Sequence, residues 1–265
     1  MPIQDQTGSL RRVYVREPVA DDTSAWGPYG WHAPPDPARA ADEHAAFRAE
    51  LEHAGADVWL GAAEVPGDPD AIYTYDPILM TDAGAIVLRP GKPGRRAEPD
   101  AMAADLAAAG IPTVGRMEPP GTAEGGDLCW LDPSTLLAGR GYRTNRDGID
   151  QLRTMLGPSI DVEVFDLPHH RGPDACLHLL SFISPLDVDL AVAFLPMMPV
   201  RLMELLRDRD VRLVEVPDDE FETMGPNVLA LDRASRSVWT ATRRRGGGWR
   251  PRVSTCAPIE ARRSL

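Results

Sequence analysis

Apolar residues at helical spacing, followed by a glycine and a short apolar run, form a recurring pattern along this chain. Over Pro37 to His53 the spacing predicts a helix, Gly55 supplies a C-terminal cap, and Val58 and Leu60 predict a short strand. The same order of helix, break and strand recurs at 99–114, 147–167 and 199–216. Four copies of one unit are therefore expected, at intervals of roughly 50 to 60 residues.

Stretches rich in strand-forming residues lie between these copies. They are 85–88, 135–138, 190–194 and 227–231. Each period therefore resembles strand, strand, helix, strand. A period of this length favours a radial or stacked α/β repeat. An ordinary α/β sandwich is the alternative, because a helix, a glycine and a strand follow one another in many such proteins.

Composition and charge narrow the class of function. The 265 residues are 43% hydrophobic and carry a net charge of −12, which disfavours nucleic-acid binding as the main role. No apolar run reaches the roughly 18 residues of a membrane span, and the first residues lack an apolar signal segment, so we expect a cytoplasmic protein without a membrane partner. Three widely spaced cysteines, Cys129, Cys176 and Cys256, argue against a disulfide framework or a zinc site.

Two aspartates frame the first polar cluster. Asp70 and Asp76 are six residues apart around an apolar and aromatic stretch. An even spacing would place both on one face of a strand, where two carboxylates suit a planar guanidinium cation. The alternative is a pair of loop aspartates on either side of a strand.

The second cluster is Glu124-Gly125-Gly126-Asp127, which precedes an apolar run. A pair of glycines allows a close approach of the backbone to another group and lets the flanking carboxylates point into a cavity. A tight turn before a strand would have the same sequence.

The third cluster is Arg143-Thr144-Asn145, between a predicted strand and a predicted helix. An arginine at a strand end can bind a substrate carboxylate. Alternatively, Arg143 is a surface residue and Asn145 only caps the helix.

The fourth cluster is a predicted apolar strand over 176–180 with one embedded histidine. His178 can act as a general acid and base near neutral pH. A hydrogen-bonded histidine of the core is the alternative.

Taken in order, these four clusters resemble the guanidino-modifying superfamily, which includes arginine deiminase, dimethylarginine dimethylaminohydrolase and the amidinotransferases. The resemblance runs from about Arg11 to Leu231. It implies an α/β fold, a pseudo-fivefold α/β propeller (pentein) of ββαβ units, with a catalytic domain over 1–231. It also implies a small-molecule guanidino substrate, no cofactor and no metal, and it is compatible with a homodimer.

The resemblance assigns roles to individual residues. Asp70 and Asp76 would hold the substrate guanidinium, and Glu124 would orient His178, the acid and base. The substrate carboxylate would be bound by the arginines of the site, Arg143 with Arg96 or its neighbour Arg95. A cysteine thiolate would attack the guanidinium carbon, and hydrolysis of the covalent intermediate would release citrulline.

The resemblance leaves the reaction open between three outcomes. Arginine deiminases often have an aspartate two residues after the histidine, where this chain has Leu180, so N-methylated arginine is favoured over arginine. An amidinotransferase is the alternative within enzymes. A non-catalytic protein that binds arginine-like cations is the alternative from another class.

The C-terminal residues depart from the family. Residues 231–265 contain nine arginines and two acidic residues, and a basic segment over 232–265 takes the place of the last part of the fifth unit. The glycine-rich segment that carries the family's cysteine is absent, so Cys176 and Cys256 are the weak candidates for a nucleophile and the chain is expected to be impaired in catalysis. Either a basic tail without regular structure or a shifted reading frame from about Arg233 would explain this.

Overall fold

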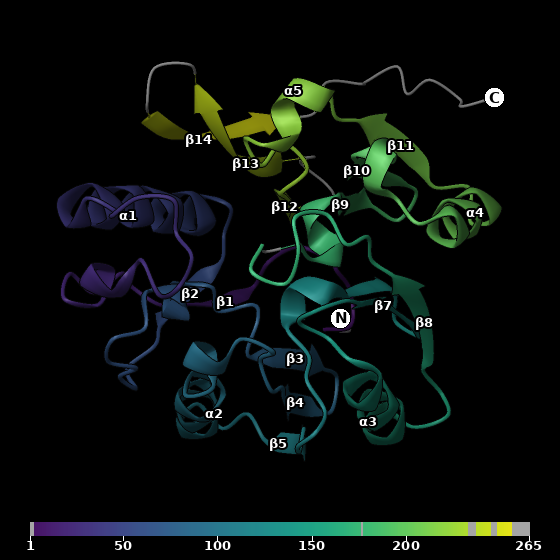
Figure 1. The fold of residues 1–265 in the computed structure, drawn as a ribbon, viewed down its shortest axis with the longest axis horizontal. Coiled ribbons are helices and arrows are strands. Elements are labelled where there is room, and N and C mark those ends of the chain that lie inside the picture. Colours follow the sequence, from purple (N-terminus) through teal and green to yellow (C-terminus); the bar gives the residue numbers. More distant parts are fainter. Residues whose placement is uncertain (1–2, 176, 233–236, 245–247, 256–265) are drawn as a thin grey trace.

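The computed structural model describes residues 3–175, 177–232, 237–244 and 248–255. Across these residues the strands form five small sheets, one of two strands and four of three. Figure 1 shows the sheets arranged about a common centre, with helices α1 to α4 on the outside. This mixed α/β architecture confirms the expected fold class.

The elements follow one another closely. The helices are α1 (Pro37–His53), α2 (Glu98–Ala108), α3 (Arg146–Leu156), α4 (Val200–Asp208) and the short α5 (Asp218–Phe221). The strands are β1 (Arg12–Val15), β2 (Asp57–Leu60), β3 (Ile78–Thr81), β4 (Gly84–Val87), β5 (Thr113–Arg116), β6 (Leu128–Asp132), β7 (Thr135–Arg140), β8 (Asp161–Asp166), β9 (Ile183–Asp187), β10 (Leu190–Ala193), β11 (Arg212–Glu215), β12 (Val228–Asp232), β13 (Ser237–Arg244) and β14 (Gly248–Thr255).

Three consecutive units share one connectivity. In each, two strands pair antiparallel, a helix follows, and a third strand pairs parallel with the second: β3-β4-α2-β5, β6-β7-α3-β8 and β9-β10-α4-β11. A parallel pair needs a long crossover, and the helix supplies it. The predicted period of strand, strand, helix, strand is confirmed, and the helix ends differ from the prediction by about one residue.

The N-terminal unit is a shorter version of the same plan. Strands β1 and β2 pair parallel, and α1 is their crossover. Asp36 caps α1 by accepting from the amides of Ala38 and Arg39, and Pro37 stands at the first helical position, where its missing N–H costs no bond. Buried side chains of β1, α1 and β12 form one small core, which includes Val15, Leu51 and Leu231.

The C-terminal strands correct one expectation. Instead of a segment without regular structure, Ser237–Arg244 and Gly248–Thr255 pair as an antiparallel hairpin, and β12 completes a three-stranded sheet. Three residues separate β13 from β14, too few for a parallel crossover, so the antiparallel arrangement follows. Cys256 lies outside the described residues.

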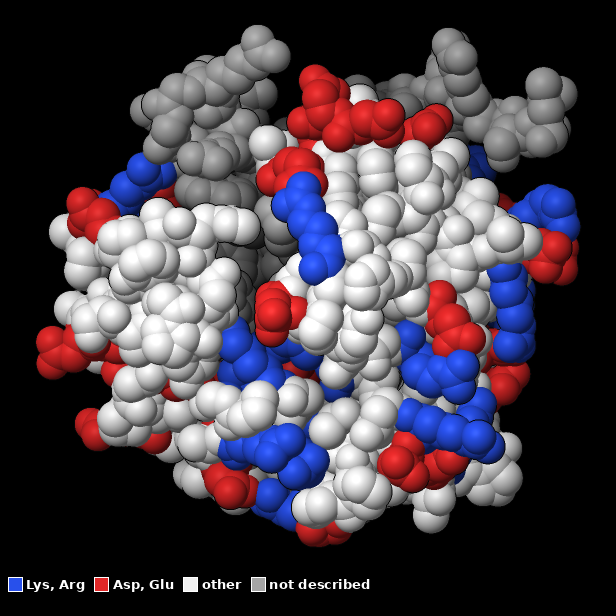
Figure 2. All heavy atoms as spheres, in the orientation of Figure 1, with Lys and Arg blue, Asp and Glu red and all other residues white. Residues whose placement is uncertain are grey.

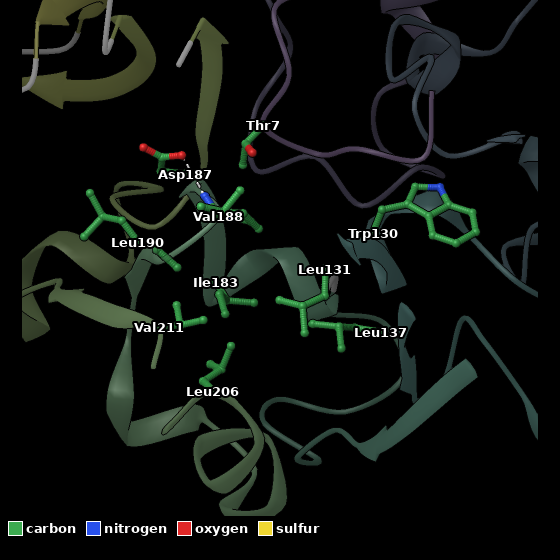
Figure 3. A pocket seen from close by; sticks show the side chains of 12 residues that line it. Thr7, Trp130, Leu131, Leu137, Ile183, Asp187, Val188, Leu190, Leu206 and Val211 are labelled. Carbon is green, nitrogen blue, oxygen red and sulfur yellow. Dashed lines mark hydrogen bonds between the residues drawn. The ribbon is translucent and has the colours of Figure 1, made fainter. Parts of the chain in front are cut away.

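Apolar side chains fill the space between the units. The largest apolar clusters lie around Phe182 and Leu202 in the fourth unit and around Leu136 and Leu152 in the third. A cavity of about 10 Å³ lies between them, lined by Leu137, Ile183 and neighbouring side chains (Figure 3). A space of this size holds at most one water molecule, so it is a packing defect and no substrate site.

Two predicted strands are wrong. Pro69–Ile72 forms a 3₁₀ helix, so Asp70 and Asp76 do not lie on one strand. Leu179–Ser181 forms another 3₁₀ helix, with His178 as the residue before it. Pro69 and the side chain of Asp68, which accepts from the Asp70 amide, favour the first turn. The second turn is favoured by the His178 amide, which donates to the Ser181 hydroxyl. Within the described part of the chain, no helix is long and apolar enough to cross a membrane.

Candidate active site

Six buried carboxylates gather where the segments that enter successive units converge. None has more than 9% of its surface exposed. They are Asp68, Asp70, Asp76, Glu98, Glu124 and Asp127. Ionised groups are costly to bury unless they are paired, so the cations around them determine what this site can do.

Arg95 occupies the middle of these carboxylates. Its guanidinium donates from Nη1 to Asp76 at 2.7 Å and binds both oxygens of Glu98, at 2.5 and 2.8 Å. Glu124 lies 3.8 Å away, and Asp70 is at the same distance. Asp70 and Asp76 are thus brought together around one guanidinium, although that group belongs to the chain itself.

The two glycines of the second cluster allow these elements to meet. A Cβ at Gly125 would collide with the backbone oxygen of Tyr75, and one at Gly126 would lie 2.8 Å from the ring of His178. The Gly126 amide also donates to Asp76 at 2.8 Å. Close backbone approach, one of the two interpretations of the glycine pair, therefore describes this turn.

His178 lies between two carboxylates. Its Nε2 is 3.3 Å from Glu124 and its Nδ1 is 3.1 Å from Asp127. Asp127 is fixed in turn, because it accepts from the Thr144 hydroxyl at 2.7 Å and from the Leu179 amide at 3.1 Å. Sequence reasoning quoted Asp127 as part of its motif but gave it no role. The position of Asp127 directly after the two glycines was the sequence feature that could have indicated a role in the site.

Each residue of the third cluster, Arg143-Thr144-Asn145, makes a contact of its own in or beside the site. Arg143 contacts Glu124 at 3.2 Å, and Thr144 bonds Asp127. Asn145 caps α3 by accepting from the Gly148 amide at 2.8 Å. The two interpretations of this motif are therefore compatible: the asparagine is a helix cap, while the arginine faces the site.

Arg95 and Arg96 point to different places. Arg96 is exposed and lines a separate cavity of about 190 Å³ with Arg89 and Arg116. Only Arg95 is brought to the carboxylates, and its guanidinium is already bound there. Figure 2 shows basic and acidic atoms interleaved over the lower half of this face of the molecule.

The electrostatics of the site keep one carboxylate strongly ionised. Burial would raise the pKa of Glu124, but His178, Arg143 and Arg95 together outweigh burial and lower it to about 2. For Glu98 the balance is reversed: burial, with Asp68 and Asp76 nearby, raises its pKa to about 8 despite Arg95. Burial also raises the pKa of Asp68. The site therefore holds both a carboxylate whose pKa is lowered and two carboxyl groups whose pKa values are raised.

The described residues also limit the choice of a nucleophile. Cys129 lies in β6, has no exposed surface, and burial raises the pKa of its thiol to about 12. Such a thiol is inert at neutral pH. Cys176 and Cys256, the two candidates from the sequence, both lie outside the described residues.

Three groups of the site could also serve as metal ligands. Asp76, Glu124 and His178 offer ligand atoms within 4.8 Å of one another. The Arg95 guanidinium is hydrogen-bonded to Asp76 and close to Glu124, so a metal ion would compete with it for the same oxygens.

Comparison with known proteins identifies the family. The family model for arginine deiminase matches residues 63–232. The N(G),N(G)-dimethylarginine dimethylaminohydrolase of Streptomyces coelicolor is 31% identical over 154 residues, 57% of either chain, and the enzyme of the same name from Pseudomonas aeruginosa is 33% identical over 125 residues, 46% of this chain and 47% of the relative. The chain thus matches about half the length of these curated relatives.

A solved structure shares the fold. The dimethylarginine dimethylaminohydrolase from Pseudomonas aeruginosa, a cysteine-to-serine mutant complexed with citrulline, is 24% identical with a TM-score of 0.65, over 82% of this chain and 80% of that one. Fold and matches together define the class as the guanidino-modifying superfamily. Within it, this chain belongs to the arginine deiminase family.

Proposed function

We propose that the carboxylate cluster binds the guanidinium of arginine or N-methylated arginine and that the chain is a hydrolase acting on its guanidinium carbon. The observation that carries this proposal is the gathering of Asp70, Asp76 and Glu124 within 3.8 Å of one buried guanidinium, that of Arg95. Carboxylates that are placed around one guanidinium can accept from another. Membership of the arginine deiminase family supports a guanidinium as the ligand cation.

The proposed residue roles come from the family resemblance, and the geometry of the site supports those of His178 and Glu124. Asp70 and Asp76 would bind the substrate cation, which requires Arg95 to move aside, and Arg143 would bind the substrate carboxylate. A protonated His178 donates from both ring nitrogens, and Glu124 and Asp127 each lie where one donor can be accepted. Glu124 would thereby orient His178 and stabilise its charged form.

The reaction would proceed in two steps. A thiolate adds to the guanidinium carbon, and the C–N bond to the leaving nitrogen breaks as His178 gives that nitrogen a proton. His178 then takes a proton from water, and the hydroxide attacks the same carbon. The C–S bond breaks to release the thiolate, and the new hydroxyl group loses its proton to solvent, which leaves citrulline. Cys176 and Cys256 are the two sources of thiolate to be tested.

Citrulline formation tests this function. Purified protein with L-arginine or N,N-dimethylarginine should release citrulline, and His178→Ala and Glu124→Gln should lower the rate at least roughly 100-fold. Cys176→Ser and Cys256→Ser decide which thiol reacts. Ornithine in place of citrulline, formed only when glycine is added, would instead indicate amidino transfer. An active His178→Ala variant would contradict the proposed roles.

A non-catalytic binder of arginine-like cations is the second candidate. The sequence favours it, because the glycine-rich segment that carries the family's cysteine is not found in these 265 residues and the buried thiol of Cys129 is inert. Saturable binding of L-arginine that depends on Asp76, without any product, would support this candidate over the hydrolase.

A further inference from the structure

A second cavity lies outside the carboxylate cluster, and three arginines line it. Its volume is about 190 Å³, and the arginines come from the segment after β4 (Arg89), the segment before α2 (Arg96) and the end of β5 (Arg116). None of the six buried carboxylates lines this cavity. The proposed hydrolase function therefore does not use it.

Two of these guanidinium groups have no acidic partner. Arg89 donates to the backbone oxygen of Gly121 at 3.2 Å, and Arg96 donates to that of Pro90 at 3.4 Å. Among the described residues, no carboxylate oxygen lies within 4 Å of the nitrogens of either group. Although the chain has a net charge of −12, two positive charges in this cavity are thus left unbalanced, and a bound anion would balance them.

The rest of the lining also favours an anion. Asp100 is already paired with Arg116 at 2.7 Å, which leaves Glu118 as the other carboxylate of the lining and the lining as a whole with a net positive charge. Strands β4 and β5 run parallel and both end at the cavity, and the first turn of α2 contributes Pro99 and Asp100 (Figure 1). The carboxyl ends of parallel strands commonly bind ligands, and the positive end of a helix dipole attracts anions.

We propose that this cavity binds a phosphate group, either as the free ion or on a small molecule. One guanidinium can pair with both oxygens of a carboxylate, whereas a phosphate has enough oxygens for Arg89 and Arg96 to bind it at the same time. The volume of about 190 Å³ lies below the roughly 300 Å³ at which pockets for drug-sized ligands begin. The ligand is therefore small, and these two arginines are its binding residues.

Calorimetric titration with inorganic phosphate at low ionic strength tests this site. The unmodified chain should bind phosphate saturably, and Arg96→Met should bind it roughly 10-fold more weakly because a charge-assisted contact is lost. Arg89→Met should show a similar loss. Arg207→Met removes an exposed arginine of α4 that lies beside Asp208, so this control has the same net charge and should bind within about 2-fold of the unmodified chain.

Further titrations separate this cavity from the candidate active site and distinguish the possible ligands. Arg143→Met changes an arginine of the carboxylate cluster and should bind phosphate as the unmodified chain does. Succinate, a dicarboxylate, should bind more weakly than phosphate. Glycerol 3-phosphate distinguishes the two sources of the group: tighter binding than that of inorganic phosphate indicates a phosphorylated small molecule, and weaker binding indicates the free ion.

Several results would overturn the proposal. They are the absence of saturable phosphate binding to the unmodified chain, equal affinities in this chain and Arg96→Met, an equal loss in Arg143→Met or Arg207→Met, and tighter binding of succinate than of phosphate. Arg96 is exposed, so its replacement leaves the core intact and decides the question even if Arg89→Met fails to fold. Because no readout uses citrulline or L-arginine, failure of the proposed function leaves this test unaffected.

Discussion

The third unit and the C-terminal sheet begin alike and end differently. In the third unit, β6 and β7 pair antiparallel, α3 crosses over, and β8 returns parallel to β7. In the C-terminal sheet, β12 and β13 also pair antiparallel, but β14 follows after three residues and pairs antiparallel too. The difference is the crossover helix, because only a long connection can bring a strand back parallel.

The two regions also differ in their apolar core, in their charge and in the number of candidate site residues that they carry. Residues 128–166 contain a helix with buried Ile149 and Leu152 that closes an apolar core. Residues 233–265 contain nine arginines and one acidic residue, and no candidate site residue but Cys256. The match to the arginine deiminase family model ends at residue 232.

A substitution in the core of the third unit should cause the largest loss of stability. Leu152→Ala removes a side chain with no exposed surface and should lower the free energy of unfolding by about 3 kcal/mol. Urea unfolding measures the change. Val200→Ala, at a residue 74% exposed, is the control and should stay within about 0.5 kcal/mol. Equal effects would mean that this core contributes little to stability.

A loss of unfolding free energy of similar size is expected when Glu124 loses its charge, and this loss should depend on pH. The lowered pKa of about 2 means that the ionised carboxylate stabilises the fold above its ordinary pKa, and that this contribution is lost as pH falls from about 4.5 to 2. The difference between the two pKa values corresponds to about 3 kcal/mol.

Glu124→Gln should therefore be less stable than the unmodified chain at pH 6, and the gap should close near pH 2. Urea unfolding over this pH range measures both. Asp150→Asn, which changes an exposed carboxylate on α3, should show no comparable gap. A gap that persists undiminished at pH 2 would contradict the assigned ionisation.

The cap of α3 should show a smaller effect. Asn145 accepts from the Gly148 and Thr122 amides, so Asn145→Ala should cost about 1 to 2 kcal/mol. Asn145→Asp keeps an accepting oxygen and should recover most of this loss. Thermal unfolding compares the three proteins. No loss in the alanine variant would show that the cap does not limit the stability of this unit.

Removal of the hairpin should have the smallest effect on ligand binding. Every residue of the carboxylate cluster precedes residue 179, so a chain that ends at Asp232 should bind L-arginine within about 2-fold of the full chain. Calorimetry on the monomeric fraction measures this, because the bared edge of β12 favours association. Loss of binding would place part of the site beyond residue 232.

Sequence patterns predicted the elements better than the local shape of the site. Helix spacing placed α1 to α4 to within about one residue, with glycines marking the ends of α1, α2 and α3. The strand around Asp70 and Asp76 was wrong, because Pro69 and the Asp68 cap favour a 3₁₀ turn. The segment of His178 was wrong because the Ser181 hydroxyl bonds the His178 amide, and no periodicity reveals that contact.

The partners of the site could not be predicted either. Asp70 and Asp76 were expected to hold a substrate guanidinium, and the side chain of Arg95, to which no role at these aspartates was assigned, lies beside both of them. Glu98 carried no signal, since an isolated charge in a loop looks like a solvated surface residue until the fold buries it. The hairpin of β13 and β14 was missed because arginines and glycines hid its strand pattern.

Binding of a guanidinium at the buried carboxylates is the central claim, and calorimetric titration with L-arginine tests it most directly. The unmodified chain should bind saturably, Asp76→Asn should bind at least roughly 10-fold more weakly, and the exposed Asp150→Asn should bind like the unmodified chain. Equal affinities in all three proteins, or no binding to the unmodified chain, would contradict the claim.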